Sequence, residues 1–162
     1  MPDLITHTVA AYIIRKRSIS TPDLLLYIFG AMLPDLATRP FMILYPPSRY
    51  FFHTFHTPVA MMLIVYLISQ FFEDSIKNHV MKLLGLGVLT HLFLDFFQAG
   101  VGARGYSWFF PFSYWDFNYG LFWPEDSISV LPIVITVFLV DFLYTYFKNR
   151  KSVYEMKKIN SK

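Results

Sequence analysis

Long apolar segments separated by polar turns constrain this chain more than any other feature of its sequence. A helix needs about 20 predominantly apolar residues to cross a bilayer, and in lipid its backbone groups must bond to one another. The apolar fraction is 55% and the charged fraction is 15%, a balance typical of membrane proteins. The sequence predicts spanning helices over residues 24–45, 53–72, 80–99 and 128–147.

A shorter apolar segment, residues 1–14, precedes these spans and ends at a basic cluster. It covers about 20 Å as a helix, too little to cross a bilayer alone. The predicted fold is therefore all-α: an integral membrane helical bundle of four spanning helices plus a short N-terminal half-spanning helix. We expect one membrane-embedded domain over residues 1–147 and a frayed, basic cytoplasmic tail over 148–162. Within residues 24–45, Pro34 is expected to kink or break the helix, and Thr21 to cap its start.

Charge distribution predicts the orientation. The basic cluster at residues 15–17 and the basic tail should both be cytoplasmic, and the loop over 100–127 should face outward. The chain is thus expected in the cell membrane as a multi-pass protein, without a cleavable signal peptide. The net charge of +3 forms no basic stripe, so no nucleic-acid partner is expected. Cysteine is absent, which excludes disulfides and thiolate metal sites.

Ionisable residues inside the apolar segments are the unusual feature. Each costs roughly 2.5–3.5 kcal/mol near the bilayer centre by insertion scales. Counting helix rises places several of them in one layer of the outer half of the bilayer, and a shared cation there would offset the cost. Simple hydrogen bonding, or a helix cap after Pro34, is the alternative explanation for individual members. The layer holds His7, Asp35, His53, His56, His91 and Asp95.

The outward loop supplies the candidates for substrate binding. Arg104 lies between two glycines and could contact a substrate, or be a solvated loop charge. Trp108 and Trp115 belong to an aromatic stretch that could form a lid or a groove for an acyl chain. The same stretch is also typical of the aromatic belt at a membrane surface.

Five short motifs resemble, in order, those of the membrane-bound metal-dependent hydrolases, a family that includes LexA-regulated inner-membrane hydrolases. The motifs are "PDLITHT", "GAMLPD", "HTFHT", "GVLTHLFLD" and "WFFPFS", and they extend from residue 2 to residue 113. That family is distantly similar to the zinc phospholipases C and the zinc single-strand nucleases, which are all-α enzymes with clustered metal ions.

The resemblance implies the roles of individual residues. Asp35, His53 and Asp95 are the catalytic candidates; Asp35 would also bridge two metals, and His53 would be a ligand or an outer partner. The basic residue that the family carries after His53 is threonine in this sequence. The distantly similar zinc enzymes carry a further His/His/Glu set late in the chain, and this sequence lacks it, so one or two ions are expected rather than three. The implied metal ligands are His7, Asp35, His56, His91 and Asp95.

Three functions remain open from the sequence. The first is a hydrolase in which zinc activates water against a phosphoester or ester of a lipid, a lipid-linked molecule or a small-molecule substrate, at a site facing outward. The second is a module that binds or transports metal ions or protons. The third is a structural membrane protein whose helices are held together by a metal, without chemistry.

Overall fold

The computed structural model describes residues 4–15, 19–99, 106–121, 123 and 126–160. Helices dominate these residues, and the β-structure among them is an isolated bridge between Tyr106 and Phe117, so the all-α prediction is confirmed. The elements in chain order are α1 (Leu4–Ile14), α2 (Thr21–Leu44), a 3-10 turn η1 (Pro46–Ser48), α3 (Arg49–Phe55), α4 (Pro58–Ser69), α5 (Lys77–Phe96) and α6 (Asp126–Asn160).

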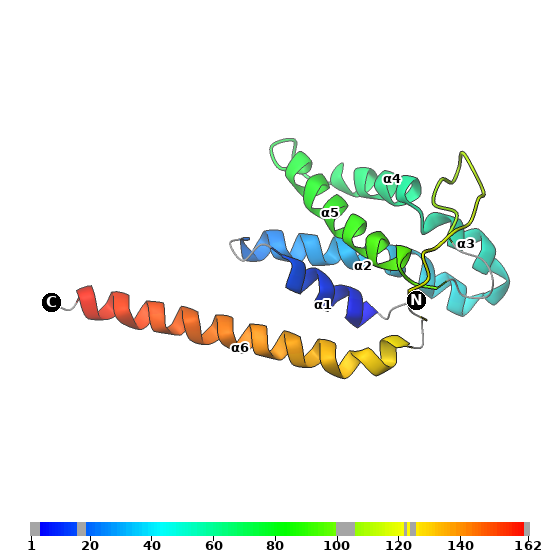
Figure 1. Cartoon of the computed structure of the whole chain (residues 1–162). Coiled ribbons are helices and arrows are strands. Elements are labelled where there is room, and N and C mark those ends of the chain that lie inside the picture. Colours follow the sequence, from blue (N-terminus) through cyan, green and yellow to red (C-terminus); the bar gives the residue numbers. More distant parts are fainter. Residues whose placement is uncertain (1–3, 16–18, 100–105, 122, 124–125, 161–162) are drawn as a thin grey trace.

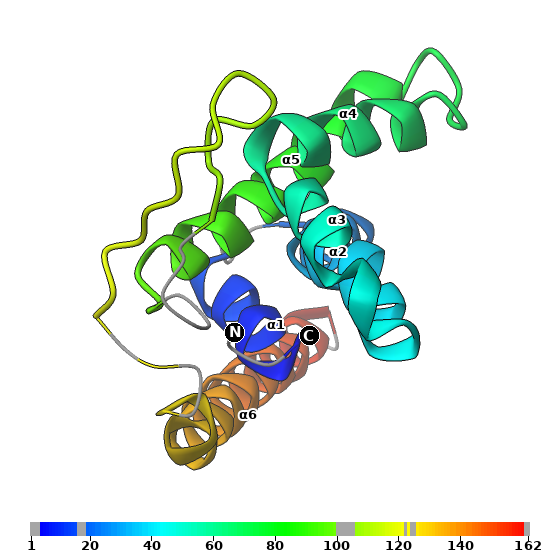
Figure 2. The same ribbon diagram turned by 90° about the vertical axis from the view of Figure 1, so that its right-hand side faces the viewer.

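Helices α2 and α5 form the centre of the molecule. Figure 1 shows α5 crossing α2, with α4 beside α5 and α1 beside α2. The main hydrophobic core lies between α2, α4 and α5, and includes Met61, Val65, Leu84 and Val88, each at most 1% exposed. In the end-on view of Figure 2, α6 lies next to α1, on the side away from α4.

Two glycines allow α2 and α5 to approach closely. A Cβ atom on Gly30 would lie 2.3 Å from the Leu84 carbonyl oxygen, and one on Gly87 would lie 2.2 Å from the Tyr27 carbonyl oxygen. Both distances are below van der Waals contact, so any side chain would push the helices apart. Small residues at such crossings are the usual means of helix association in membranes.

The proline-containing helix α2 differs from the expectation. It runs without a break from Thr21 to Leu44, through both Pro34 and Pro40, so the alternative that Pro34 breaks the helix is wrong. The carbonyl oxygen of Pro34 accepts a second bond, from the Thr38 hydroxyl at 2.7 Å, and the surrounding helices hold the segment in place. The N-cap is Ser20 rather than Thr21, because the Ser20 hydroxyl accepts the Asp23 amide at 3.3 Å.

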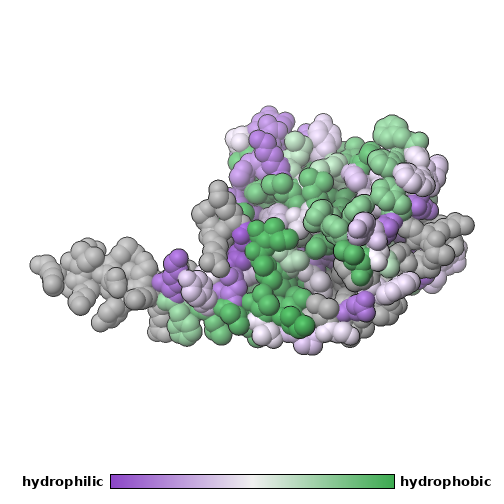
Figure 3. All heavy atoms as spheres, in the orientation of Figure 1, coloured by the Kyte–Doolittle hydropathy of each residue, from purple (hydrophilic) through white to green (hydrophobic). Residues whose placement is uncertain are grey.

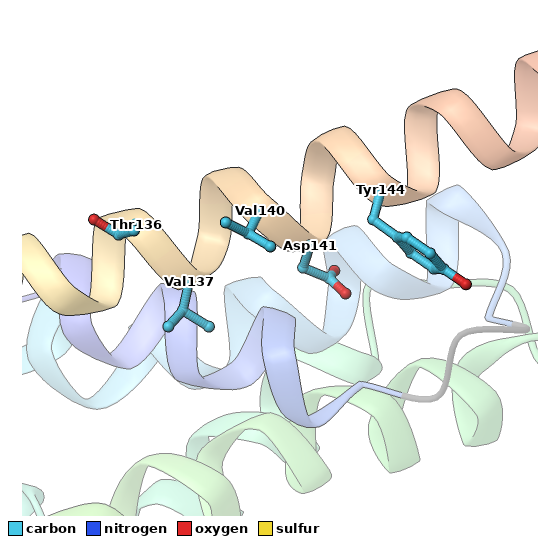
Figure 4. Close-up of a pocket in the computed structure, with 5 residues that line it drawn as sticks. All are labelled: Thr136, Val137, Val140, Asp141 and Tyr144. Atoms are coloured by element: carbon cyan, nitrogen blue, oxygen red, sulfur yellow. The ribbon is translucent and has the colours of Figure 1, made fainter.

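Helix α6 is longer than predicted and has a contact that the sequence did not indicate. It continues through the basic segment to Asn160, so the expectation of a frayed tail is wrong. Asp141 pairs with Arg15 of α1, with the Arg15 Nη2 and Asp141 Oδ2 atoms 3.2 Å apart. Figure 4 shows Asp141 pointing from α6 toward α1, in a shallow groove that Val137 and Tyr144 also line.

Apolar side chains cover much of the outside. Figure 3 shows them over α1 and the adjacent part of α6, and the exposed fractions of Ile133, Val140 and Phe147 on α6 exceed 60%. Among the described helices, α5 alone is both long and apolar enough to cross a membrane. The apolar helices α1 and α4 have 11 and 12 residues. The four-span arrangement therefore stays a prediction.

The glycine contact generates the first prediction. Gly87→Ala should lower the free energy of unfolding by about 1–3 kcal/mol, because its methyl group meets the α2 backbone. Thermal unfolding in detergent, followed by circular dichroism, measures the change. Gly85→Ala is the matched control on the same helix, since its Cβ atom would meet only the Met62 side chain, at 3.6 Å. Equal unfolding midpoints for the two variants would contradict the prediction.

Candidate metal centre

Three histidines and two aspartates from four segments meet inside the helical bundle. Helix α1 supplies one histidine and α2 one aspartate. The residue after α3 is the second histidine, and α5 supplies the third histidine and the second aspartate. Each residue is at most 2% exposed, so the group is withdrawn from solvent. The members of this cluster are His7, Asp35, His56, His91 and Asp95, the same five that the resemblance implied.

Asp95 lies at the middle of the cluster. Its Oδ2 atom is 2.7 Å from His56 Nε2 and 3.3 Å from His91 Nε2, and its Oδ1 atom is 3.3 Å from His7 Nε2. Asp35 is less central: its Oδ1 atom is 3.9 Å from His91 Nε2 and 2.8 Å from Arg39 Nε. The bridging role between two ions that the resemblance implies for Asp35 stays a prediction.

Hydrogen bonds indicate where the proton lies on two of the three imidazoles, those of His91 and His56. His91 Nδ1 lies 2.7 Å from the Ala31 carbonyl oxygen, which can only accept, so Nδ1 carries the proton. His56 Nε2 lies 2.7 Å from Asp95 Oδ2, a carboxylate oxygen that can only accept, so this nitrogen carries a proton unless a cation takes its place. The Thr38 hydroxyl lies 3.5 Å from His56 Nδ1, at the limit of a hydrogen bond. His91 Nε2, in contrast, presents a lone pair to the cluster.

The inward nitrogens of His56 and His91 face each other. The Nε2 atoms of His56 and His91 are 3.1 Å apart, with carboxylate oxygens around them, so a proton or a cation must lie among them. His7 Nδ1 and Asp35 Oδ2 are buried with neither a hydrogen bond nor an ion pair in the described part of the chain. Buried polar groups are normally paired, and an ion is one of the few things that can satisfy several at once.

The donor set fits a divalent cation. The ligand atoms of His7, Asp35 and His91 lie within 4.8 Å of one another, as do those of His56, His91 and Asp95. Imidazole nitrogen and carboxylate oxygen are ligands that zinc accepts. His91 belongs to both groups but offers one nitrogen, because the other is bonded to Ala31. It can therefore bind one ion only, and a second ion would have to rely on the other four residues.

Local structure explains how the sequence delivers these side chains. His91 and Asp95 are four residues apart in α5 and therefore lie on one helix face. The close contact of α5 with α2, at Gly30 and Gly87, brings the Ala31 carbonyl within reach of His91. His56 follows the end of α3 with φ −84° and ψ 47°, outside helical geometry, and this turn directs its ring inward.

His53 lies outside the cluster of metal-ligand candidates. Helix α3 ends at Phe55, between His53 and His56, so helical spacing does not place these two side chains on one face. The ring of His53 stacks on Tyr106, with centroids 4.7 Å apart, and His53 belongs to neither ligand group among the described residues. His53 is thus placed beside the cluster, and its catalytic role stays a prediction.

The residues expected to bind substrate have different surroundings. Trp108 donates its indole N–H to the Phe117 carbonyl at 2.6 Å and packs against the main core, contacts that support the loop itself. Trp115 is 65% exposed and lies against Phe117. Arg104 lies outside the described residues. Their roles toward a substrate stay predictions.

Sequence reasoning missed three polar residues around the cluster. Thr38 is three residues after Asp35, and Gln98 is three residues after Asp95, so helical spacing from each acid could have indicated them. Gln98 is 1% exposed, and its side-chain amide has no partner in the described part of the chain.

Tyr106 is the third, and no sequence signal points to it. It is 4% exposed and faces the carboxylates, and burial raises the pKa of its phenol well above the usual range. The nearby charge of Asp95 contributes in the same direction. The hydroxyl therefore keeps its proton and can act as a hydrogen-bond donor.

Comparison with known proteins identifies the family. No curated protein and no solved structure matches this chain. One family model matches residues 3–158, which includes all five cluster residues and nearly the whole chain. A match of this extent shows the membership and also supports the expectation of a membrane protein. The chain belongs to the YdjM inner membrane protein family.

Proposed function

We propose that this inner membrane protein is a metal-dependent hydrolase, acting on a phosphoester or ester of a lipid, a lipid-linked molecule or a small-molecule substrate. The observation that carries the proposal is the convergence of three imidazoles and two carboxylates at one buried point, from four separate segments. Their nearest ligand atoms lie 2.7–3.9 Å apart, which brings five ionisable groups into direct contact.

A bound cation is the simplest way to stabilise this arrangement. The inward nitrogens of His56 and His91 are 3.1 Å apart, and the carboxylates of Asp35 and Asp95 both lie beside His91. A cation attracts all four groups at once. Zinc suits the nitrogen and oxygen donors, and the cysteine-free sequence excludes a thiolate site. We propose one or two ions.

The chain's own residues supply the rest of the proposed chemistry. When bound, a divalent cation acts as a Lewis acid and lowers the pKa of coordinated water toward neutrality. Asp35 and Asp95 are the acceptors placed to take up a proton released there. Arg39 pairs with Asp35 while its side chain remains 27% exposed, so it connects the buried cluster with the surface and can attract an anionic substrate.

The proposed placement puts the cluster toward the outer face, with four spans, the half-spanning α1 and the basic tail in the cytoplasm. The exposed apolar side chains of α1, α4 and α6 support a lipid environment around the bundle. The aromatic loop is a candidate for contact with lipid headgroups, because Phe112, Tyr114 and Trp115 are each more than 60% exposed.

A second candidate function follows from the burial of the cluster. All five ligands are at most 2% exposed, which is typical of a structural metal that connects helices without catalysis. A structural site is closed by protein ligands, whereas a catalytic site keeps a position open for water. Metal binding and turnover must therefore be measured separately.

The first test is metal binding. His91→Ala and His56→Ala should each lower the affinity for zinc by more than about 100-fold, because each removes a direct ligand, whereas outer partners typically contribute 10–100-fold. Isothermal titration of the detergent-solubilised, chelator-treated protein measures the affinity.

The controls are the two histidines that lie outside the cluster. His53→Ala should retain binding to within about tenfold, because His53 stacks beside the cluster, and His79→Ala should bind like the wild type, because His79 is exposed and paired with Asp23. Equal losses for all four variants, or no zinc binding by the wild type, would contradict the proposal.

The second test is hydrolysis. The purified protein should cleave a phosphodiester or ester probe, such as bis(p-nitrophenyl) phosphate, p-nitrophenyl acetate or phospholipid vesicles, in a zinc-dependent manner. Chelation should abolish turnover and zinc should restore it, and Asp95→Asn should reduce turnover at least 100-fold, because this carboxylate contacts three imidazoles.

Asp74→Asn, an exposed acid outside the bundle, should leave turnover unchanged. Zinc binding that raises the unfolding temperature without turnover on any probe would favour the structural role instead.

A further inference from the structure

The loop after α5 is attached firmly to the end of that helix. Asn118 donates through Nδ2 to the Gln98 carbonyl at 2.7 Å, and its Oδ1 atom accepts the Tyr106 amide at 2.9 Å. The amides of Tyr119 and Leu121 bond to the carbonyls of Phe96 and Phe97 at 2.9 and 2.7 Å. These bonds satisfy carbonyl groups that a helix C-terminus leaves unpaired, and they fix the position of Tyr106.

The ring of Tyr106 stacks on two imidazoles. Its ring stacks on His53, with centroids 4.7 Å apart and planes 6° apart, and on His56 at 5.2 Å and 24°. Tyr106 is 4% exposed, so solvent does not compete for these faces. These two contacts connect α3 and the residue after it with the loop, and His56 is a cluster imidazole.

His56 needs this support more than His91 does. His91 belongs to a regular helix, and its Nδ1 atom makes a 2.7 Å bond to a backbone carbonyl. His56 lies outside α3, and its Nδ1 atom reaches the Thr38 hydroxyl only at 3.5 Å, at the limit of a hydrogen bond. The stacked face of Tyr106, with its centroid 5.2 Å away, is therefore a contact outside the cluster against which the His56 ring can be oriented.

We infer that Tyr106 is a positioning residue of the metal centre: its ring, stacked on His53 and on His56, keeps the His56 imidazole directed at the cation. This inference rests on the proposed metal binding and adds a residue from the loop to it. Outer contacts that orient a ligating histidine commonly change metal affinity by 10–100-fold. The ring, rather than the hydroxyl, carries the effect.

Cobalt(II) is the probe for the test, because its visible absorption reports the coordination geometry. Tyr106→Phe keeps the ring and should retain the wild-type spectrum and affinity within about threefold. Tyr106→Leu removes the ring and should lower the Co²⁺ affinity at least tenfold and alter the spectrum. Tyr114→Leu, an exposed aromatic residue of the same loop, should behave like the wild type.

A double-mutant cycle separates positioning from folding. In a His56→Ala background, Tyr106→Leu should cost no further Co²⁺ affinity, because the ligand that it orients is already missing. A further tenfold loss there, wild-type binding by Tyr106→Leu, or equal losses for the Phe and Leu variants would overturn the inference while leaving the proposed metal binding intact. Failure of the wild type to bind Co²⁺ or zinc would overturn both.

Discussion

The crowding of buried ionisable groups is the constraint on which the rest of this structure depends. Imidazole nitrogens and carboxylate oxygens lie 2.7–3.9 Å apart in a site that is almost fully buried. In a medium of low polarity, uncompensated groups of this kind would cost a large part of the stability of a small domain. A bound cation would make the electrostatic energy of this group favourable, because each imidazole nitrogen and carboxylate oxygen would then face positive charge.

Packing determines whether that compensation is possible. The α2–α5 crossing is tight because glycines lie where the backbones meet, and this contact places the Ala31 carbonyl against His91. Helix α1 lies between α6 and the central pair, and the Arg15–Asp141 ion pair connects it to α6. Thus α6, which carries no motif, supports the helix that brings His7 to the cluster.

The sequence predicted the cluster residues better than their surroundings. The convergence of His7, Asp35, His91 and Asp95 was predictable from helix rise, and the structure brings these four side chains together. The direction of His56 was not, because it depends on a turn after α3 rather than on helical spacing. Pro34 did not break α2 because tertiary contacts outweigh local propensity. The stacking of Tyr106 depends on a loop whose path no periodicity encodes.

X-ray absorption at the zinc edge, on protein purified in detergent and loaded with zinc, tests the central claim most directly. The account predicts a first shell of nitrogen and oxygen atoms at about 2.0–2.2 Å, with the outer scattering of two or three imidazoles and no sulfur. A shell without imidazole scattering, or protein that retains no zinc, would contradict the claim that a cation holds this cluster together.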